Sequence, residues 1–119
     1  MKNIFVLLLL ALIGCSSDVV SKNYANYDHA EADKLFERGW LPRIIPKSSK
    51  NIKTKNNLDL NTSVGEFTFN LVESNNFIAQ LKSTDRIENG YTMYKYANGY
   101  TSWVFKINLK NGHVKYEIN

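Results

Sequence analysis

The chain is poor in the residues from which most catalytic and metal sites are built. Its 119 residues include one cysteine, Cys15, and two histidines, His29 and His113. Neither histidine has a cysteine or a carboxylate at metal-ligand spacing, and no G-x-S-x-G, H-E-x-x-H or glycine-rich phosphate loop occurs. A catalytic pair of carboxylates drawn from Asp59, Glu73 and Asp85 remains an alternative, but the spacing of these residues does not favour any particular pair. We expect a non-catalytic protein without a metal or cofactor, with both histidines on the solvated surface.

Long apolar runs are also scarce. Only residues 4–13, IFVLLLLALI, are uninterrupted, and Lys2 places a positive charge before them. As a helix this run would span about 15 Å, roughly half the hydrocarbon core of a bilayer. It is therefore too short for a membrane span and typical of the apolar region of a secretory signal. No comparable run follows, so we do not expect the rest of the chain to be a membrane protein.

The lone cysteine follows this run directly. It has no disulfide partner in the chain, and a free thiol lost on cleavage is one reading of it. Residues 12–15, LIGC, resemble the lipobox of bacterial lipoproteins. That resemblance implies cleavage between Gly14 and Cys15, diacylglycerol (and often a further acyl chain such as palmitate) on Cys15, and attachment to a membrane through this lipid. Two or more acyl chains would hold the protein stably on a membrane surface.

The lipobox also implies a division of the chain and an address. Residues 1–14 are the expected cleaved signal peptide, residues 15–27 a lipidated N-terminus and polar tether, and residues 28–119 a single domain. Ser16, rather than Asp, follows the cysteine. In lipoproteins this implies the outer membrane of a Gram-negative host, with the domain facing the periplasm.

The charge of the chain gives little indication of a partner. Loss of Lys2 with the signal lowers the formal net charge from +4 to +3, which is no argument for nucleic acid. The densest basic cluster is Lys47, Lys50, Lys53 and Lys55. We expect a solvated loop there, with a docking patch for anionic lipid or polymer as the alternative.

The pattern predicts two helices. Asp28 in the N-cap position, Glu31 three residues later and Gly39 at the end favour a helix over residues 29–38. A second helix is expected over residues 74–83, with Ser74 as its cap.

The first half of the chain otherwise predicts little regular structure. Pro42 and Pro46 favour an extended segment, in which Ile44 and Ile45 suit a short edge strand. Residues 47–63 are polar and read as a helical turn near residues 48–53 followed by a loop. The alternation in residues 65–71, GEFTFNL, predicts a half-buried strand.

The last part of the chain carries the clearest signals. Asn-Gly pairs at residues 98–99 and 111–112 lie between alternating apolar runs, which predicts hairpins. The expected strands of this three-stranded meander are residues 91–97, 100–109 and 113–118.

Two-residue turns at both pairs would also fix the register. Tyr94 would then face Trp103, Ile107 would face Tyr116, and Lys106 would face Glu117. The side chains expected on the core face of the middle strand are Trp103, Phe105, Ile107 and Leu109.

Together these elements predict a two-layer α+β fold. A mostly antiparallel sheet of about four to five strands, ending in the meander, would pack against one or two helices.

A binding module is the most economical function for such a domain. Four large side chains are expected on the sheet face opposite the core, and they form a possible partner surface: Tyr91, Met93, Tyr100 and Val104. A helix or loop covering that face is the structural alternative. The expected role is that of a lipid-anchored envelope protein that binds another protein. An immunity lipoprotein that neutralises a toxin, or a protein that binds peptidoglycan or another glycan, are the alternatives.

A further similarity concerns the middle of the chain. Residues 32–52, ADKLFERGWLPRIIPKSSKNI, followed by GEFTFNL, resemble a small bacterial domain, the YbbD head domain. The matching positions are Gly39, Trp40, Pro42, Pro46, Ser48, Phe67 and Phe69, while Ser49 replaces the family's usual alanine. The resemblance implies a compact domain and supplies no activity.

Overall fold

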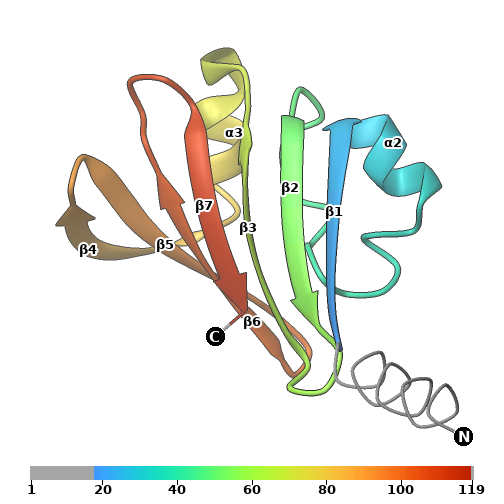
Figure 1. The fold of residues 1–119 in the computed structure, drawn as a ribbon. Helices are drawn as coiled ribbons and strands as arrows, with labels where there is room; N and C mark the ends of the chain where they lie inside the picture. The colour runs from blue at the N-terminus through green and yellow to red at the C-terminus, as the bar shows by residue number, and fades with distance from the viewer. Residues whose placement is uncertain (1–17, 119) are drawn as a thin grey trace, which may run out of the picture.

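A computed structural model describes residues 18–118, which form a single seven-stranded antiparallel sheet (Figure 1). The strand order is β1-β2-β3-β7-β6-β5-β4. The strands are β1 (Val19–Asn26), β2 (Lys50–Asn57), β3 (Thr62–Thr68), β4 (Lys82–Glu88), β5 (Tyr91–Asn98), β6 (Thr101–Ile107) and β7 (His113–Ile118). The helices are short: α2 (Tyr27–Ala32), the 3-10 turn η1 (Leu71–Glu73) and α3 (Ser74–Ile78). The expected two-layer α+β fold is therefore wrong, because the described chain is mostly β. The expected signal peptide and Cys15 lie outside the described residues.

One face of the sheet carries the core. Phe67, Phe105 and Ile107 on that face are at most 1% exposed. The α3 residue Phe77 packs onto them, with its ring centroid 5.7 Å from that of Phe105 and the two rings edge to face. Both helices and the turns between α2 and β2 contribute to the same cluster, through Tyr27, Ala30, Leu35, Phe36, Leu41, Ile45 and Phe77. We call this face the inner face and the opposite one the outer face.

The helix after β1 is shorter than expected. Lys34 has a φ of 62°, and the N–H groups of Lys34 and Leu35 donate to the carbonyls of Glu31 and Ala30. This is the hydrogen-bond pattern of a Schellman motif, so the helix ends before Gly39. Its N-cap is Asn26, whose side chain accepts from the N–H of His29, rather than Asp28.

The second helix is also shorter than predicted. α3 ends at Ile78, and the hydroxyl of Ser74 donates to the carbonyl of Leu71 instead of capping the helix. The expected edge strand at Ile44 and Ile45 is absent, since residues 43–45 form turns that bury Ile45 against the core.

Two strands replace segments that were expected to be irregular. Residues 19–26, assigned to the tether, form β1, and residues 50–57 of the expected polar loop form β2. The inward positions of β2 alternate as in any strand, but they include Thr54 and Asn56, which are polar and at most 5% exposed. Their polarity concealed the strand from a reading based on hydrophobic alternation.

A third unexpected strand, β4, pairs with β5. Between them Asn89 and Gly90 have φ values of 52° and 83°, as a type I′ turn requires at both central positions. This is a third Asn-Gly pair, and it precedes the two pairs, at residues 98–99 and 111–112, from which the hairpins of the meander were predicted.

The meander itself is confirmed, but its registers are wrong by two residues. Tyr94 pairs with Phe105, and Phe105 pairs with Tyr116. The first loop is Gly99-Tyr100 instead of Asn98-Gly99, and the second loop is longer than two residues. A shift of two residues keeps every paired side chain on its face. Leu109, however, leaves the ladder and is exposed.

Candidate functional site

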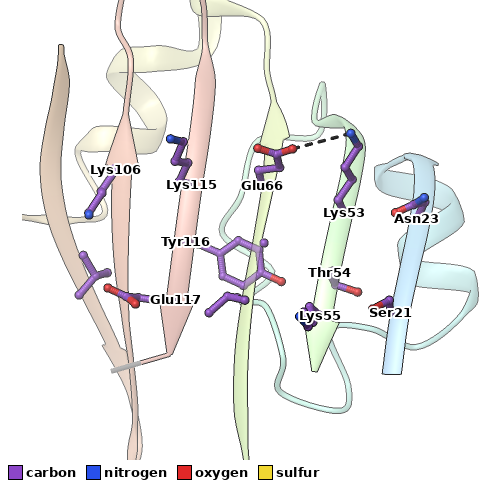
Figure 2. A pocket seen from close by; sticks show the side chains of 13 residues that line it. Ser21, Asn23, Lys53, Thr54, Lys55, Glu66, Lys106, Lys115, Tyr116 and Glu117 are labelled. Carbon is purple, nitrogen blue, oxygen red and sulfur yellow. Dashed lines mark ion pairs between the residues drawn. The ribbon is translucent and has the colours of Figure 1, made fainter. Parts of the chain in front are cut away.

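The outer face of the sheet carries a groove of about 510 Å³ that crosses five strands (Figure 2). Neither α2 nor α3 covers it, because both pack on the inner face. Its outward-facing lining residues are Ser21 and Asn23 of β1, Lys53 and Lys55 of β2, Val64 and Glu66 of β3, Lys115 and Glu117 of β7, and Val104 and Lys106 of β6. We call these residues the outer groove. Four lysines and two glutamates give it a positive balance.

The four groove lysines differ in their ion pairs. Lys53 lies 3.8 Å from a Glu66 oxygen. Within residues 18–118, Lys55 and Lys115 make no ion pair. Lys115 lies directly opposite Glu66 on β3 and directly opposite Lys106 on β6, where Glu117 was expected to face Lys106. Like charges in cross-strand pairs are destabilising, and the Lys106 ammonium lies 4.0 Å from a Glu88 oxygen.

A chain of polar contacts borders the groove. The Tyr91 hydroxyl lies 2.8 Å from His113 Nδ1, and His113 Nε2 lies 3.1 Å from a Glu66 oxygen. The Lys115 ammonium lies over the Tyr91 ring, 5.0 Å from its centroid. Both ring nitrogens of His113 thus have hydrogen-bond partners, and the side chain is half-buried, so the prediction of a solvated His113 is wrong. His29 is exposed, as expected. These contacts hold Tyr91, Glu66 and Lys115 in place around the edge of the groove.

The predicted partner residues lie partly on this face. Tyr91, Met93 and Val104 do belong to the outer face, and Val104 forms part of the groove. Tyr100 does not, because it lies in the turn between β5 and β6. Lys53 and Lys55 belong to the basic cluster predicted from the sequence, but that cluster was expected in a loop, whereas both lysines lie on strand β2 and line the groove. The alternation of Ile52, Lys53, Thr54 and Lys55 is the signal that could have placed them on a strand. Lys106 and Lys115 were not predicted to belong to a binding surface.

A buried polar network lies beneath the groove. Ser63 Oγ donates to Asn56 Oδ1 at 2.6 Å and lies 3.2 Å from the Tyr116 hydroxyl. Burial raises the pKa of Tyr116 to about 12, and the Ser63 hydrogen bond offsets part of that rise. The Tyr116 ring lies against Gly65, where an added Cβ would come within 2.7 Å of it. Gly65 therefore allows the ring to cross β3 and fix the strands under the groove.

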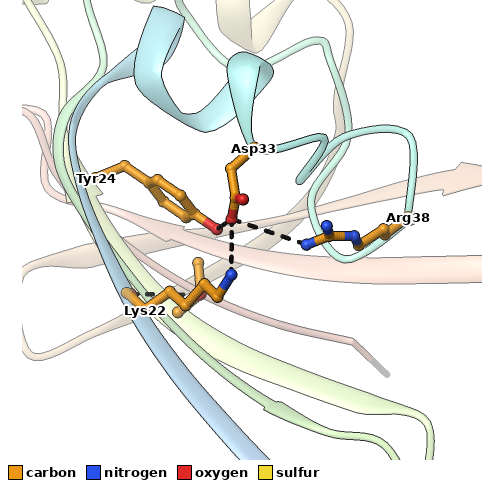
Figure 3. Close-up of polar contacts among 5 residues, drawn as sticks. Lys22, Tyr24, Asp33 and Arg38 are labelled. Carbon is orange, nitrogen blue, oxygen red and sulfur yellow. Dashed lines mark hydrogen bonds and ion pairs between the residues drawn. The ribbon is translucent and has the colours of Figure 1, made fainter.

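A second cluster lies on the inner side of β1 (Figure 3). One Asp33 oxygen accepts from the Tyr24 hydroxyl at 2.6 Å and from the Lys22 ammonium at 3.0 Å, and Arg38 is 3.8 Å away. Burial and the hydrogen bond to Asp33 raise the pKa of Tyr24. Hydrogen bonds from Tyr24 and Lys22 lower the pKa of Asp33. The cluster attaches edge strand β1 to the turns after α2, so we assign it a structural role.

The described residues offer neither a metal centre nor a membrane-spanning helix. Among residues 18–118, His, Asp and Glu side chains do not gather in groups of three that could hold a metal ion. In the same part of the chain, every helix is too short or too polar to cross a bilayer.

The resemblance to the YbbD head domain is confirmed over part of the chain. Residues 18–68 match the model of that family, which covers β1, α2, β2 and β3. Within the match, Trp40 accepts a hydrogen bond from Trp103 Nε1 at 3.1 Å through its carbonyl, and Ser48 accepts one from the N–H of Asn70. No curated protein and no solved structure matches the chain. The chain is thus similar to the YbbD head domain from residue 18 to residue 68, and strands β4 to β7 lie beyond the match.

Proposed function

We propose that this chain is a lipid-anchored envelope protein without catalytic activity, which binds an acidic segment of another protein in the outer groove. The lipid on Cys15 would hold it at a membrane, in a two-membrane host the outer one. The observation that carries the binding role is the one-sided sheet: both helices pack on the inner face, and the lysine-rich groove lies on the other.

The chemistry of the groove favours a carboxylate-bearing partner. A carboxylate placed between Lys106 and Lys115 would reduce the repulsion of this like-charged cross-strand pair, which Glu88 reduces only from the Lys106 side. Lys55 supplies a further ammonium without an ion pair in the described chain. Tyr91 and Met93 continue the outer face beyond the groove and provide apolar area with a hydroxyl tip. Hydrogen bonds between charged groups are the stronger kind, so a few of them suffice for a specific contact.

A titration of the full-length protein with a glutamate-rich peptide tests the groove. The double variant Lys55→Gln with Lys115→Gln should weaken binding strongly, and added salt should weaken wild-type binding because surface charges are screened. The matched control is Lys47→Gln with Lys50→Gln, which changes the net charge equally outside the groove lining. Equal affinity in both double variants would contradict the groove as the site.

Affinity capture from envelope extracts separates the alternatives. A single tight protein partner, lost in the groove variant and retained in the control, supports the protein-binding role and includes an immunity role when that partner is a toxin. Sedimentation with purified peptidoglycan, dependent on the same lysines, would instead support a wall-binding protein and overturn the proposed partner class.

The anchor has its own test. Mass spectrometry of the mature protein should show a diacylglycerol thioether at Cys15, and Cys15→Ser should release the protein from membranes. An unmodified sulfur at Cys15 would refute the anchor and leave the groove proposal standing.

A further inference from the structure

Three segments meet at the end of the sheet where β1 begins. The N–H of Leu58, in the loop after β2, donates to the carbonyl of Asp18 at 2.9 Å. Asn61 of the same loop and Tyr100 of the β5–β6 turn line a common hollow with Trp40. Figure 1 shows the β2–β3 loop and the β5–β6 turn side by side below the start of β1. We call this end, comprising residues 18–19, 58–61 and 99–100, the proximal end.

The proximal end exposes large apolar and aromatic side chains. Leu58 and Leu60 are 56% and 68% exposed, Tyr100 is fully exposed, and Val19 is partly exposed. Single exposed apolar residues need no explanation, but a group of them at one end indicates a contact surface.

The charges at this end are mixed. Arg38 lines the hollow beside Tyr100, while Asp18 and Asp59 contribute negative charge. An attraction to this end would therefore come from apolar burial and from the amphipathic tyrosine, with little contribution from charge.

The chain length to Cys15 limits where the proximal end can lie. Asp18 is the third residue after Cys15. Three residues reach at most about 11 Å even when fully extended. If Cys15 carries the lipid, the start of β1 is held within that distance of the headgroups, whatever the conformation of the connecting residues.

We propose that the proximal end docks on the bilayer that holds the lipid of Cys15, with Leu58, Leu60 and Tyr100 entering the headgroup region. Tyrosine is enriched at that depth because its ring is apolar and its hydroxyl is polar. The inference rests on the proposed anchor. It adds an orientation: the strands stand on the membrane by their proximal ends, and the outer groove opens sideways toward the envelope space, where a partner can reach it.

The test uses the full-length, lipidated protein in phosphatidylcholine vesicles. Single cysteines replace Leu60 or Tyr100, with Val72→Cys as the matched control, because Val72 is 84% exposed and follows the opposite end of β3. An environment-sensitive fluorophore on each cysteine is read with brominated lipids as the quencher. We expect a blue shift and strong quenching at Leu60 and Tyr100, and neither at Val72. Replacing part of the lipid with phosphatidylglycerol should change these results little, because the docking is apolar.

The outcomes separate the two proposals. Protein that remains with the vesicles while the Leu60 and Tyr100 probes stay solvated and unquenched overturns the docking and leaves the anchor intact. Equal quenching at Val72 overturns the orientation. Protein that does not associate with the vesicles overturns the anchor and the docking together.

Discussion

The buried hydroxyl of Tyr116 makes the stability of this domain sensitive to alkaline pH. The Tyr116 hydroxyl lies 3.2 Å from Ser63 Oγ in the buried network, and either oxygen can be the donor of this hydrogen bond. Tyr116 is 3% exposed, and burial raises its pKa to about 12 from the ordinary value of 10.0. A folded pKa above the unfolded one means that the stabilising contribution is complete below pH 10 and is lost as the pH rises from there through the folded pKa.

The size of the effect follows from the shift. The rise of the pKa from 10.0 to about 12 corresponds to roughly 3 kcal/mol of stability when fully expressed, and roughly 2 kcal/mol of it is lost by pH 12. Tyr116→Phe removes this dependence together with one hydrogen bond, which costs about 1 kcal/mol at pH 8. The variant should therefore be less stable than the wild type at pH 8 and more stable at pH 12. We expect the sign to change between about pH 10 and pH 12.

Urea unfolding at a series of pH values measures the difference. Effects of pH on the rest of the protein are common to both proteins and cancel in the comparison. Tyr100→Phe is the control, since it removes a fully exposed hydroxyl and should follow the wild type at every pH. A Tyr116→Phe deficit that stays constant from pH 8 to pH 12 would refute the reasoning.

Three further predictions concern packing and the β1 cluster. Gly65→Ala should destabilise the fold by at least about 1–3 kcal/mol in urea unfolding, because the new Cβ would lie 2.1 Å from the Lys53 carbonyl of β2; an unchanged midpoint would contradict this. Phe77→Ala should cost about 3–5 kcal/mol through the cavity it leaves between Phe69 and Phe105, whereas Val72→Ala, at an exposed position, should change stability by less than about 0.5 kcal/mol. The hydrogen bonds that lower the pKa of Asp33 contribute stability above its ordinary value of 3.8, and that contribution is lost as the pH falls through the folded pKa. Asp33→Asn should thus lose less stability on acidification than the wild type, and parallel acid titrations of the two would count against the cluster.

Strands were predictable where large apolar side chains alternate with polar ones. Phe67, Phe105 and Tyr116 occupy such positions, and β3, β5, β6 and β7 were expected near their observed places. Strand β2 was not predicted, because its inward-facing residues include the polar side chains of Thr54 and Asn56. The hydrogen bond from Ser63 to Asn56, and the contact of Ser63 with Tyr116, form only when β2, β3 and β7 are assembled. A polar side chain becomes acceptable in a core when it is hydrogen-bonded there. Asn56 finds its partner in Ser63 of the next strand, and the Thr54 hydroxyl donates to the carbonyl of Lys22 on β1, which is far away in the sequence.

The candidate site likewise has a part that the sequence predicts and a part that depends on how the strands pair. Tyr91, Met93 and Val104 could be assigned to the outer face from the period of two residues alone, and a register error of two residues did not move them. The groove lysines could not be assembled in this way, because Lys53 and Lys115 meet across β3 only through the pairing of β3 with β7.

The sequence by itself determined the alternation of the C-terminal strands, the position of their hairpins and the resemblance to a lipobox, since each depends on neighbouring residues. The tertiary structure alone decided that β1 and β2 extend the meander into a seven-stranded sheet with one covered face. It also placed Lys106 opposite Lys115, because loop lengths set the register, and the register decides which charges face each other across two strands.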